Sequence, residues 1–168
     1  LKELGYTTFT QVQNESIPHL LAGKDLIGQS KTGSGKTLAF GLPILARINV
    51  QHRRIQALII CPTRELCAQV AREIRRAARK EPGLQVLVLA GGQPAGPQRA
   101  ALEKGAHIAV GTPGRLLDLL DRSLDLRSVK TIVLDEADRM LDMGFQEDME
   151  DILGAAPRSR QTVFFSAT

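Results

Sequence analysis

Short apolar runs recur along the chain, and each is followed by a polar turn. The runs that predict β-strands cover residues 25–28, 57–61, 85–89, 108–110, 131–134 and 162–165. Amphipathic spacing predicts helices from about Lys36 and from Arg64 to about Arg79. Thr112 and Pro113 are typical of a helix cap and a first helical position. Strands that are apolar at nearly every position are buried on both faces, so the pattern predicts an α/β domain with a mostly parallel central sheet and helices on both faces.

The order of the predicted strands also indicates where a ligand would bind. In a parallel sheet, ligands bind beyond the carboxyl ends of the strands. The glycine-rich and charged segments of this sequence directly follow the apolar runs. The candidate site is therefore expected at that edge of the sheet.

Bulk composition narrows the class of protein. The chain has 168 residues, enough for one domain with a substantial core, and is 43% hydrophobic and 24% charged. No apolar run approaches the roughly 20 residues that cross a bilayer. Residues 1–4 carry no secretory leader, so we expect a cytoplasmic protein that spans no membrane. The net charge of +4 permits a polyanionic partner without requiring one.

The cysteines and histidines form no metal-ligand pattern. Cys61 and Cys67 match no zinc or redox spacing, so we expect both thiols to stay reduced. His19, His52 and His107 are isolated in the sequence, and we assign them no functional role.

Residues 30–37 (SKTGSGKT) match the phosphate-binding pattern G-x-x-x-x-G-K-[ST], except that Ser30 replaces the first glycine. Glycines let backbone N–H groups converge on phosphate oxygens, and the helix that follows adds its positive end. The residues expected to bind the nucleotide here are Thr32, Gly33, Ser34, Gly35, Lys36 and Thr37. Lys36 would contact the β- and γ-phosphates, and the Thr37 hydroxyl would ligate Mg²⁺. An ordinary flexible turn is the alternative interpretation.

Two acidic residues directly follow the apolar run at 131–134, so both can project at its carboxyl end. Asp135 would hold Mg²⁺, and Glu136 would orient and deprotonate an attacking water. Together with Lys36, they are the candidate catalytic residues. A helix N-terminus decorated with acids is the alternative interpretation, because the helix dipole favours acids there.

An ordered series of segments resembles the motifs of DEAD-box RNA helicases. The segments are 5–13 (GYTTFTQVQ), 30–37, 62–66 (PTREL), 91–92 (GG), 112–115 (TPGR), 135–145 (DEADRMLDMGF) and 166–168 (SAT). The resemblance spans nearly the whole chain. It implies a RecA-like P-loop NTPase domain, the first of two, that binds ATP and Mg²⁺.

The resemblance also implies roles for residues outside the phosphate loop. Gln13 would read adenine, which suits an amide able to pair with both an amino group and a ring nitrogen. Tyr6 would pack against the adenine ring, with simple core packing as the alternative. Asp138, Ser166 and Thr168 would couple the nucleotide site to the RNA surface.

An RNA surface is implied at the same edge of the sheet. Its residues would be Thr63, Arg64, Gly91, Gly92, Thr112 and Arg115. Backbone amides and guanidinium groups would contact the sugar–phosphate backbone, so we expect little sequence preference. For Arg64 and Glu65, a plain surface helix start is the alternative. The basic runs at 72–80 and 52–54 are interpreted as solvated faces.

The sequence departs from the family pattern at four positions. Phe9 and Gln11 stand where prolines are usual, and Ser30 and Cys67 stand where alanines are usual. These changes remove no group with a chemical role. Within the family, segments 91–94 and 156–161 resemble the bacterial dead-box protein A group, which acts on large-subunit ribosomal RNA.

These expectations combine into one hypothesis with one alternative. The chain would be the ATP-binding core domain of an ATP-dependent RNA helicase that couples ATP hydrolysis to RNA unwinding or remodelling, with ribosome assembly as the implied role. An ATP-gated RNA clamp that does not unwind is the alternative. Because the chain starts at Leu1 and ends at Thr168, we expect cuts through a longer protein with a second RecA-like domain and an appended RNA-binding domain. That second domain would supply a cationic finger, so residues 1–168 alone are expected to be monomeric and nearly inactive.

Overall fold

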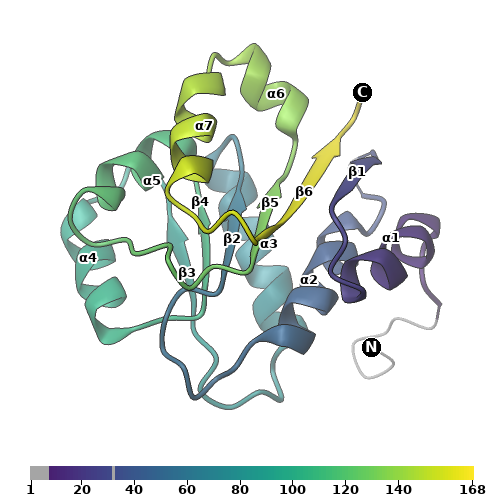
Figure 1. Ribbon diagram of the computed structural model, residues 1–168, viewed down its shortest axis with the longest axis horizontal. Helices are drawn as coiled ribbons and strands as arrows, with labels where there is room; N and C mark the ends of the chain where they lie inside the picture. Colours follow the sequence, from purple (N-terminus) through teal and green to yellow (C-terminus); the bar gives the residue numbers. More distant parts are fainter. Residues whose placement is uncertain (1–7, 32) are drawn as a thin grey trace.

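The structure of the chain, a computed structural model, describes residues 8–31 and 33–168 (Figure 1). The strands in these ranges are β1 (Leu26–Gln29), β2 (Ala57–Ile60), β3 (Val86–Leu89), β4 (Ile108–Gly111), β5 (Thr131–Leu134) and β6 (Gln161–Ser166). The helices are α1 (Gln11–Leu21), α2 (Lys36–Arg47), α3 (Arg64–Ala77), α4 (Ala95–Lys104), α5 (Pro113–Leu120), α6 (Ala137–Asp142) and α7 (Gln146–Gly154). Each predicted strand is present within one residue of its predicted bounds.

The strands form one sheet in the order β1-β6-β5-β2-β4-β3, and every pairing is parallel. The predicted fold class is therefore confirmed. β6, the last strand in the sequence, lies between β1 and β5. The segments that follow β1, β6 and β5 are consequently neighbours at the carboxyl edge of the sheet.

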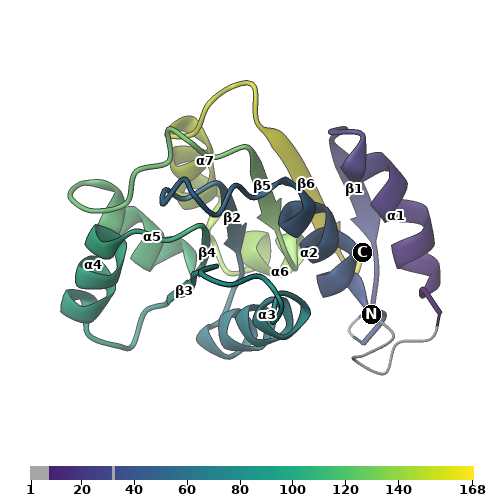
Figure 2. The same ribbon diagram turned by 90° about the horizontal axis from the view of Figure 1, so that it is seen from below.

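Helices cover both faces of the sheet (Figure 2). Alternate residues of β2 show why its sequence is apolar throughout. Ile59 packs in the cluster that holds α1, α2 and α3, whereas Leu58 and Ile60 pack in the cluster that holds α5, α6 and α7. All four β2 residues are buried, as expected of a central parallel strand.

Helix α3 ends earlier than its amphipathic pattern suggests. The prediction ran to about Arg79, but the helix ends at Ala77, and the N–H of the next residue, Ala78, bonds to Ile74 O. A turn then leads through Gly83, whose φ of 86° favours glycine, into β3.

The cysteines are free and fully buried on the α3 side of the sheet. A hydrogen bond with Cys67, together with burial, raises the pKa of the Cys61 thiol well above its usual value. The thiol of Cys61 therefore stays protonated at neutral pH.

His107 is also fully buried. Its Nδ1 accepts the Gln85 N–H at 3.0 Å, and Nε2 lies 2.9 Å from Val50 O. The residue ties together three loops at the amino edge of the sheet, which is a structural role.

Within the described ranges, no helix is long and apolar enough to cross a bilayer.

Candidate active site

The phosphate loop connects β1 to α2 at the carboxyl edge of the sheet. Gly33 and Gly35 have φ values of 83° and 84°, a left-handed backbone that side chains rarely adopt. Gly35 is the N-cap residue of α2, so the positive end of this helix faces the loop. Of the residues predicted to bind phosphate, those at 33–37 thus occupy a glycine-dependent turn at a helix start, as the motif requires.

Ser30, which replaces the first glycine of the phosphate-binding pattern, is nearly buried and has specific partners. Its hydroxyl forms a hydrogen bond with the Ser34 hydroxyl, across the loop. Its backbone N–H donates to Ser166 O at 2.9 Å. A serine at this position therefore ties the loop to itself, and the backbone ties the loop to the end of β6.

Lys36 and Asp135 form a buried ion pair. Lys36 Nζ lies 2.9 Å from Asp135 Oδ1, and the side chains are 9% and 0% exposed. Asp135 continues β5, because its N–H donates to Ile60 O at 2.9 Å. The structure thus brings the predicted phosphate ligand and the predicted metal ligand into direct contact across β6.

The second oxygen of Asp135 is buried and has no hydrogen-bond partner among the described residues. Burial raises the pKa of Asp135 above its usual value, although the Lys36 ammonium works in the opposite direction. A buried carboxylate oxygen without a partner is costly, and a cation at this position would satisfy it. Mg²⁺ is usually held by one or two carboxylates with phosphates and waters, so Asp135 and Thr37 fit this ion. No group of three acidic, His or Cys side chains occurs in the described ranges to form an all-protein cage.

Glu136 has a strained backbone. Its φ of 54° and ψ of 50° place it in the left-handed region, and among the described residues other than glycine it alone has a positive φ. Such a conformation costs roughly 1–2 kcal/mol for a residue with a Cβ atom. It turns the chain sharply from β5 into α6, and the Glu136 side chain lines a hollow beside the phosphate loop.

Gln13 reaches the phosphate loop from α1. The residue is 3% exposed; Oε1 accepts the Thr10 N–H at 3.0 Å, and Nε2 donates to Gly35 O at 3.0 Å. Thr10 and Gln13 form a capping box at the start of α1. These two bonds determine which end of the amide is oxygen and which is nitrogen.

The hollow beside the phosphate loop has a volume of about 270 Å³. It is lined by Thr10, Gln13, Gly33, Gly35, Lys36, Thr37, Leu38, Leu66, Gln69, Glu73 and Glu136. Sequence reasoning missed the contribution of α3, and it interpreted Glu73 as part of a solvated face. The helical spacing of Leu66, Gln69 and Glu73 could have indicated that they share one face. The predicted residues Tyr6 and Thr32 lie outside the described residues.

The end of β6 contacts α6. Thr168 Oγ1 donates to Asp138 Oδ2 at 3.0 Å. Partial burial works to raise the pKa of Asp138, but hydrogen bonds from Thr168, Ser166 and backbone N–H groups outweigh it and lower that pKa. Of the three residues predicted to couple the two sites, Asp138 is therefore hydrogen-bonded to the other two.

Four of the predicted RNA residues meet in pairs at the same edge. The Gly91 N–H donates to Thr112 Oγ1 at 3.1 Å. Thr112 is the N-cap residue of α5 and Pro113 is the first helical residue, as predicted, but the Thr112 hydroxyl makes no capping hydrogen bond and serves the neighbouring loop instead. Arg64 lies over Gly92, where an added Cβ atom would come within 3.2 Å of the guanidinium.

Thr63 and Arg115 hold the same loops in place. The Thr63 hydroxyl caps α3 by accepting the Leu66 N–H at 3.2 Å. Arg115 donates to Gln93 O at 2.9 Å and to Gln98 Oε1 at 3.0 Å. All six predicted RNA residues therefore lie in loops or in the first turns of α3 and α5, at the carboxyl edge of the sheet.

Comparison with known proteins agrees with this geometry. Residues 10–168 match the family model described as DEAD/DEAH box helicase. The chain is 55% identical to the ATP-dependent RNA helicase DbpA of Escherichia coli, over all of this chain and 37% of that protein. It is 50% identical to the DEAD-box ATP-dependent RNA helicase CshA of Streptococcus pneumoniae, over all of this chain and 32% of that protein.

A solved structure shows the same fold. The crystal structure of a hypothetical ATP-dependent RNA helicase from Sulfolobus tokodaii superposes with a TM-score of 0.90 and is 41% identical, covering 99% of this chain and 48% of that one. The chain spans about a third of the length of the curated relatives it matches. Because the family model covers nearly all of the sequence and the relatives match it from end to end, the chain belongs to the DEAD/DEAH box helicase family.

Proposed function

We propose that this chain is the ATP-binding core domain of an ATP-dependent RNA helicase and couples ATP binding and hydrolysis to the remodelling of RNA. The observation that carries the proposal is the buried pair of Lys36 and Asp135, with the unsatisfied Oδ2 of Asp135 beside the phosphate loop. A residue that binds phosphate and a residue that binds a metal ion, held together at a helix start, are suited to a nucleoside triphosphate with its cation.

The adenine specificity proposed for Gln13 agrees with its hydrogen bonds. A glutamine amide has two N–H donors and two acceptor lone pairs. Thr10 uses one acceptor and Gly35 uses one donor, so one of each is left, in a fixed orientation. An adenine presents an amino donor and a ring-nitrogen acceptor, which match that remaining pair.

The phosphate groups would lie on the backbone N–H groups of residues 33–37, with Lys36 turning from Asp135 towards them. Mg²⁺, held by Asp135 and Thr37, would neutralise charge on the phosphate oxygens. Glu136 would accept a proton from the attacking water, and its strained backbone aims the carboxylate into the hollow. Strain of this kind is frequent at catalytic positions.

Coupling to RNA would run through β6. Its end is bonded to the phosphate loop through Ser30 and Ser166, and to α6 through Thr168 and Asp138. A movement of the phosphate loop or of the start of α6 would therefore move the same short segment, the end of β6. RNA would bind through its sugar–phosphate backbone on the loops that carry Arg64 and Arg115.

We further propose that this domain works with a second RecA-like domain in a longer, cytoplasmic protein, and that an RNA-binding domain is appended. The short share of the relatives' length supports this. The cationic finger would come from the second domain, so the 168-residue chain alone is expected to be a monomer with almost no turnover. The resemblance to the dead-box protein A group supports a role in ribosome assembly.

The Glu136→Gln substitution tests the proposal in the full-length protein. We expect RNA-stimulated ATP hydrolysis to be abolished, while affinity for a fluorescent ATP analogue with Mg²⁺ stays within about twofold, because the lost group acts on water and not on the phosphates. Hydrolysis that persists at the original rate would remove Glu136 from the role of base. Strand displacement by the unsubstituted protein separates a helicase from an RNA clamp.

A further inference from the structure

Three hollows adjoin one another along the amino edge of the sheet, opposite to the phosphate loop. The first is lined by Gly23, Arg47, Lys130, Ser159 and Gln161. The second shares Lys130 and Ser159 with the first, and it extends to Arg127 and Gln56. The third contains Asp125, which is hydrogen-bonded to Arg127, and it extends to Arg53, Arg54 and Lys104. We call these three adjoining hollows the amino-edge furrow.

The furrow crosses the starts of four strands that are neighbours in the sheet. Gln161 begins β6, residues 129–130 precede β5, residues 53–56 precede β2, and residues 105–106 lead into β4. In the order β6-β5-β2-β4, the starts of the outer two strands, β6 and β4, are three strand spacings apart, or about 14 Å. The furrow is therefore a feature of the tertiary structure, assembled from segments far apart in the sequence.

The furrow is strongly basic. Its cationic side chains, all on exposed residues, are Arg47, Arg53, Arg54, Lys104, Arg127 and Lys130. Its carboxylates are Glu103 and Asp125. The excess of four positive charges equals the net charge of the whole chain. The basic run at 52–54, interpreted from the sequence as a solvated face, is part of this larger surface.

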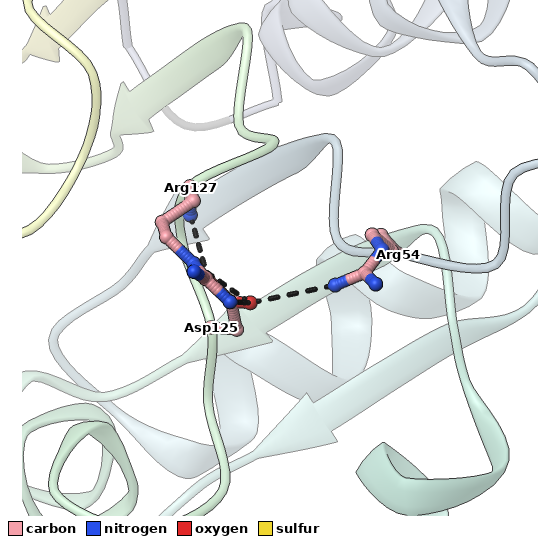
Figure 3. Close-up of polar contacts among 3 residues, drawn as sticks. All are labelled: Arg54, Asp125 and Arg127. Carbon is pink, nitrogen blue, oxygen red and sulfur yellow. Dashed lines mark hydrogen bonds and ion pairs between the residues drawn. The ribbon is translucent and has the colours of Figure 1, made fainter.

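Several of the guanidinium groups are held in fixed positions. Asp125 lies between Arg127 and Arg54, as Figure 3 shows. Its carboxylate accepts hydrogen bonds from Arg127 Nε and one terminal nitrogen, the latter at 2.8 Å, and lies 3.5 Å from Arg54. A guanidinium group has five N–H donors, so both arginines keep donors beyond those that face Asp125. The trio keeps a net positive charge.

Arg53 and Arg47 are also held in place by hydrogen bonds, to carbonyl oxygens instead of a carboxylate. Arg53 donates to Lys104 O and Gly105 O, each at 3.3 Å, and Arg47 donates to Gln161 Oε1 at 3.2 Å. Side chains already ordered by such bonds lose less conformational entropy when they bind a ligand. The furrow is therefore preorganised for an anionic partner.

The chemistry of the furrow favours phosphates over a protein surface. Among the described residues, the large apolar side chains that are exposed are Phe9, Leu21, Ile27, Leu141 and Met143, and none of them lines the furrow. Protein interfaces need an apolar or aromatic centre, whereas guanidinium groups match phosphate oxygens in pairs.

We propose that the amino-edge furrow binds the phosphate backbone of RNA, as a second contact remote from the loops of Arg64 and Arg115. A span of about 14 Å accommodates a short stretch of the RNA sugar–phosphate backbone. Contacts to phosphates alone read no sequence, and the furrow shares no lining residue with the nucleotide hollow. Binding there is consequently independent of ATP and of base sequence.

The double substitution Arg127→Gln, Lys130→Gln tests the proposal, with Arg72→Gln, Arg76→Gln on the exposed face of α3 as a control of equal charge. Affinity of the 168-residue chain for a fluorescent single-stranded oligouridine is measured without nucleotide across a salt series. We expect the furrow variant to lose roughly tenfold in affinity at low salt and its salt slope to fall by about 1.4, because two phosphate contacts are lost. The control is expected to change affinity by about twofold or less.

A cooperative thermal unfolding transition and retained nucleotide affinity show that the furrow variant is folded, and Arg54→Gln, Lys104→Gln gives a second, independent pair. An equal loss in the α3 control, or an unchanged salt slope in both furrow pairs, would overturn the proposal. So would displacement of the RNA by polyglutamate at equal charge, which would indicate an acidic protein partner. If only Arg64→Gln, Arg115→Gln weakens RNA binding, the furrow is excluded while the proposed function stands.

Discussion

Lys36 Nζ lies 2.9 Å from Asp135 Oδ1, and Asp135 is completely buried. The two residues stand about a hundred positions apart, on either side of β6, and each neutralises the charge of the other in the absence of a ligand. The Lys36 ammonium offsets the cost of burying the Asp135 carboxylate. The carboxylate in turn holds the ammonium group at the phosphate loop. Stability and nucleotide binding are thereby linked at one pair of atoms.

Replacing Lys36 with methionine should destabilise the domain by about 3 kcal/mol at pH 7.5, because it leaves a buried carboxylate without a partner. The pKa of Asp135 is already raised by burial and would rise further. A carboxyl with a raised folded pKa destabilises the fold above that pKa, and the penalty disappears as the pH falls towards the unfolded value. Urea unfolding at pH 7.5 and 5 checks this. The double variant Lys36→Met, Asp135→Asn should recover part of the loss, and a deficit that does not shrink at pH 5 would contradict the assignment.

Replacing Glu136 with glycine should make the domain more stable than replacing it with glutamine. Glutamine keeps the Cβ atom that strains the left-handed backbone, whereas glycine removes it. After the entropy cost of glycine, the expected difference is about 0.5–1 kcal/mol in the free energy of unfolding. Chemical denaturation of both variants measures it. A glutamine variant as stable as the glycine variant would show that the backbone at Glu136 is not strained.

Replacing Gly35 with alanine should be much more damaging than replacing Gly33. Both glycines have a left-handed backbone, so either alanine costs about 1 kcal/mol or more. At Gly35 the new Cβ atom would also come within 2.6 Å of Gln13 Nε2, whereas at Gly33 nothing lies within 4 Å. Unfolding and ATP-analogue binding of both variants are the measurements. Combining Gly35→Ala with Gln13→Ala should relieve part of the loss of stability, and equal effects at the two glycines would argue against the contact.

Replacing Thr112 with valine should weaken RNA binding by the full-length protein. Valine keeps the shape but removes the oxygen that accepts the Gly91 N–H, a bond expected to be worth about 1 kcal/mol. Thr112→Ser keeps the oxygen and should restore affinity. RNA titrations with a non-hydrolysable ATP analogue compare the three proteins. Tight binding by the valine variant would mean that this loop does not need the bond.

The stabilising contribution of Asp125 should depend on pH. Hydrogen bonds from Arg127 lower its pKa to about 2 from the usual 3.8. A carboxyl with a lowered folded pKa stabilises the fold above its unfolded pKa, and this contribution is lost as the pH falls from about 4 towards 2. Because the side chain is 40% exposed, we expect less than about 1 kcal/mol. The difference in urea midpoint between the unsubstituted chain and Asp125→Asn should shrink between pH 6 and 3, and Arg127→Gln should reproduce the loss. A difference that is constant with pH would count against the pairing.

The strands and the motif positions could be predicted from the sequence because they depend on local patterns. The run at residues 131–134 is apolar at three of its four positions, so it predicts a buried strand, and β5 has those bounds. Gly33 and Gly35 indicate a left-handed turn, because few other residues adopt one. The N-cap position of Thr112 follows from the sequence, but the partner of its hydroxyl does not, because Gly91 is distant in the sequence.

The sequence by itself determined the fold class, the family and the edge of the sheet where the motifs lie. Only the tertiary structure decided that β6 lies between β1 and β5, that Lys36 pairs with Asp135, and that Arg54 and Arg127 share Asp125. Apolar periodicity and glycine positions act within a few residues, so they can be read along the chain. The order of strands and the meeting of charges depend instead on how whole elements pack, and segments about a hundred residues apart become neighbours only then.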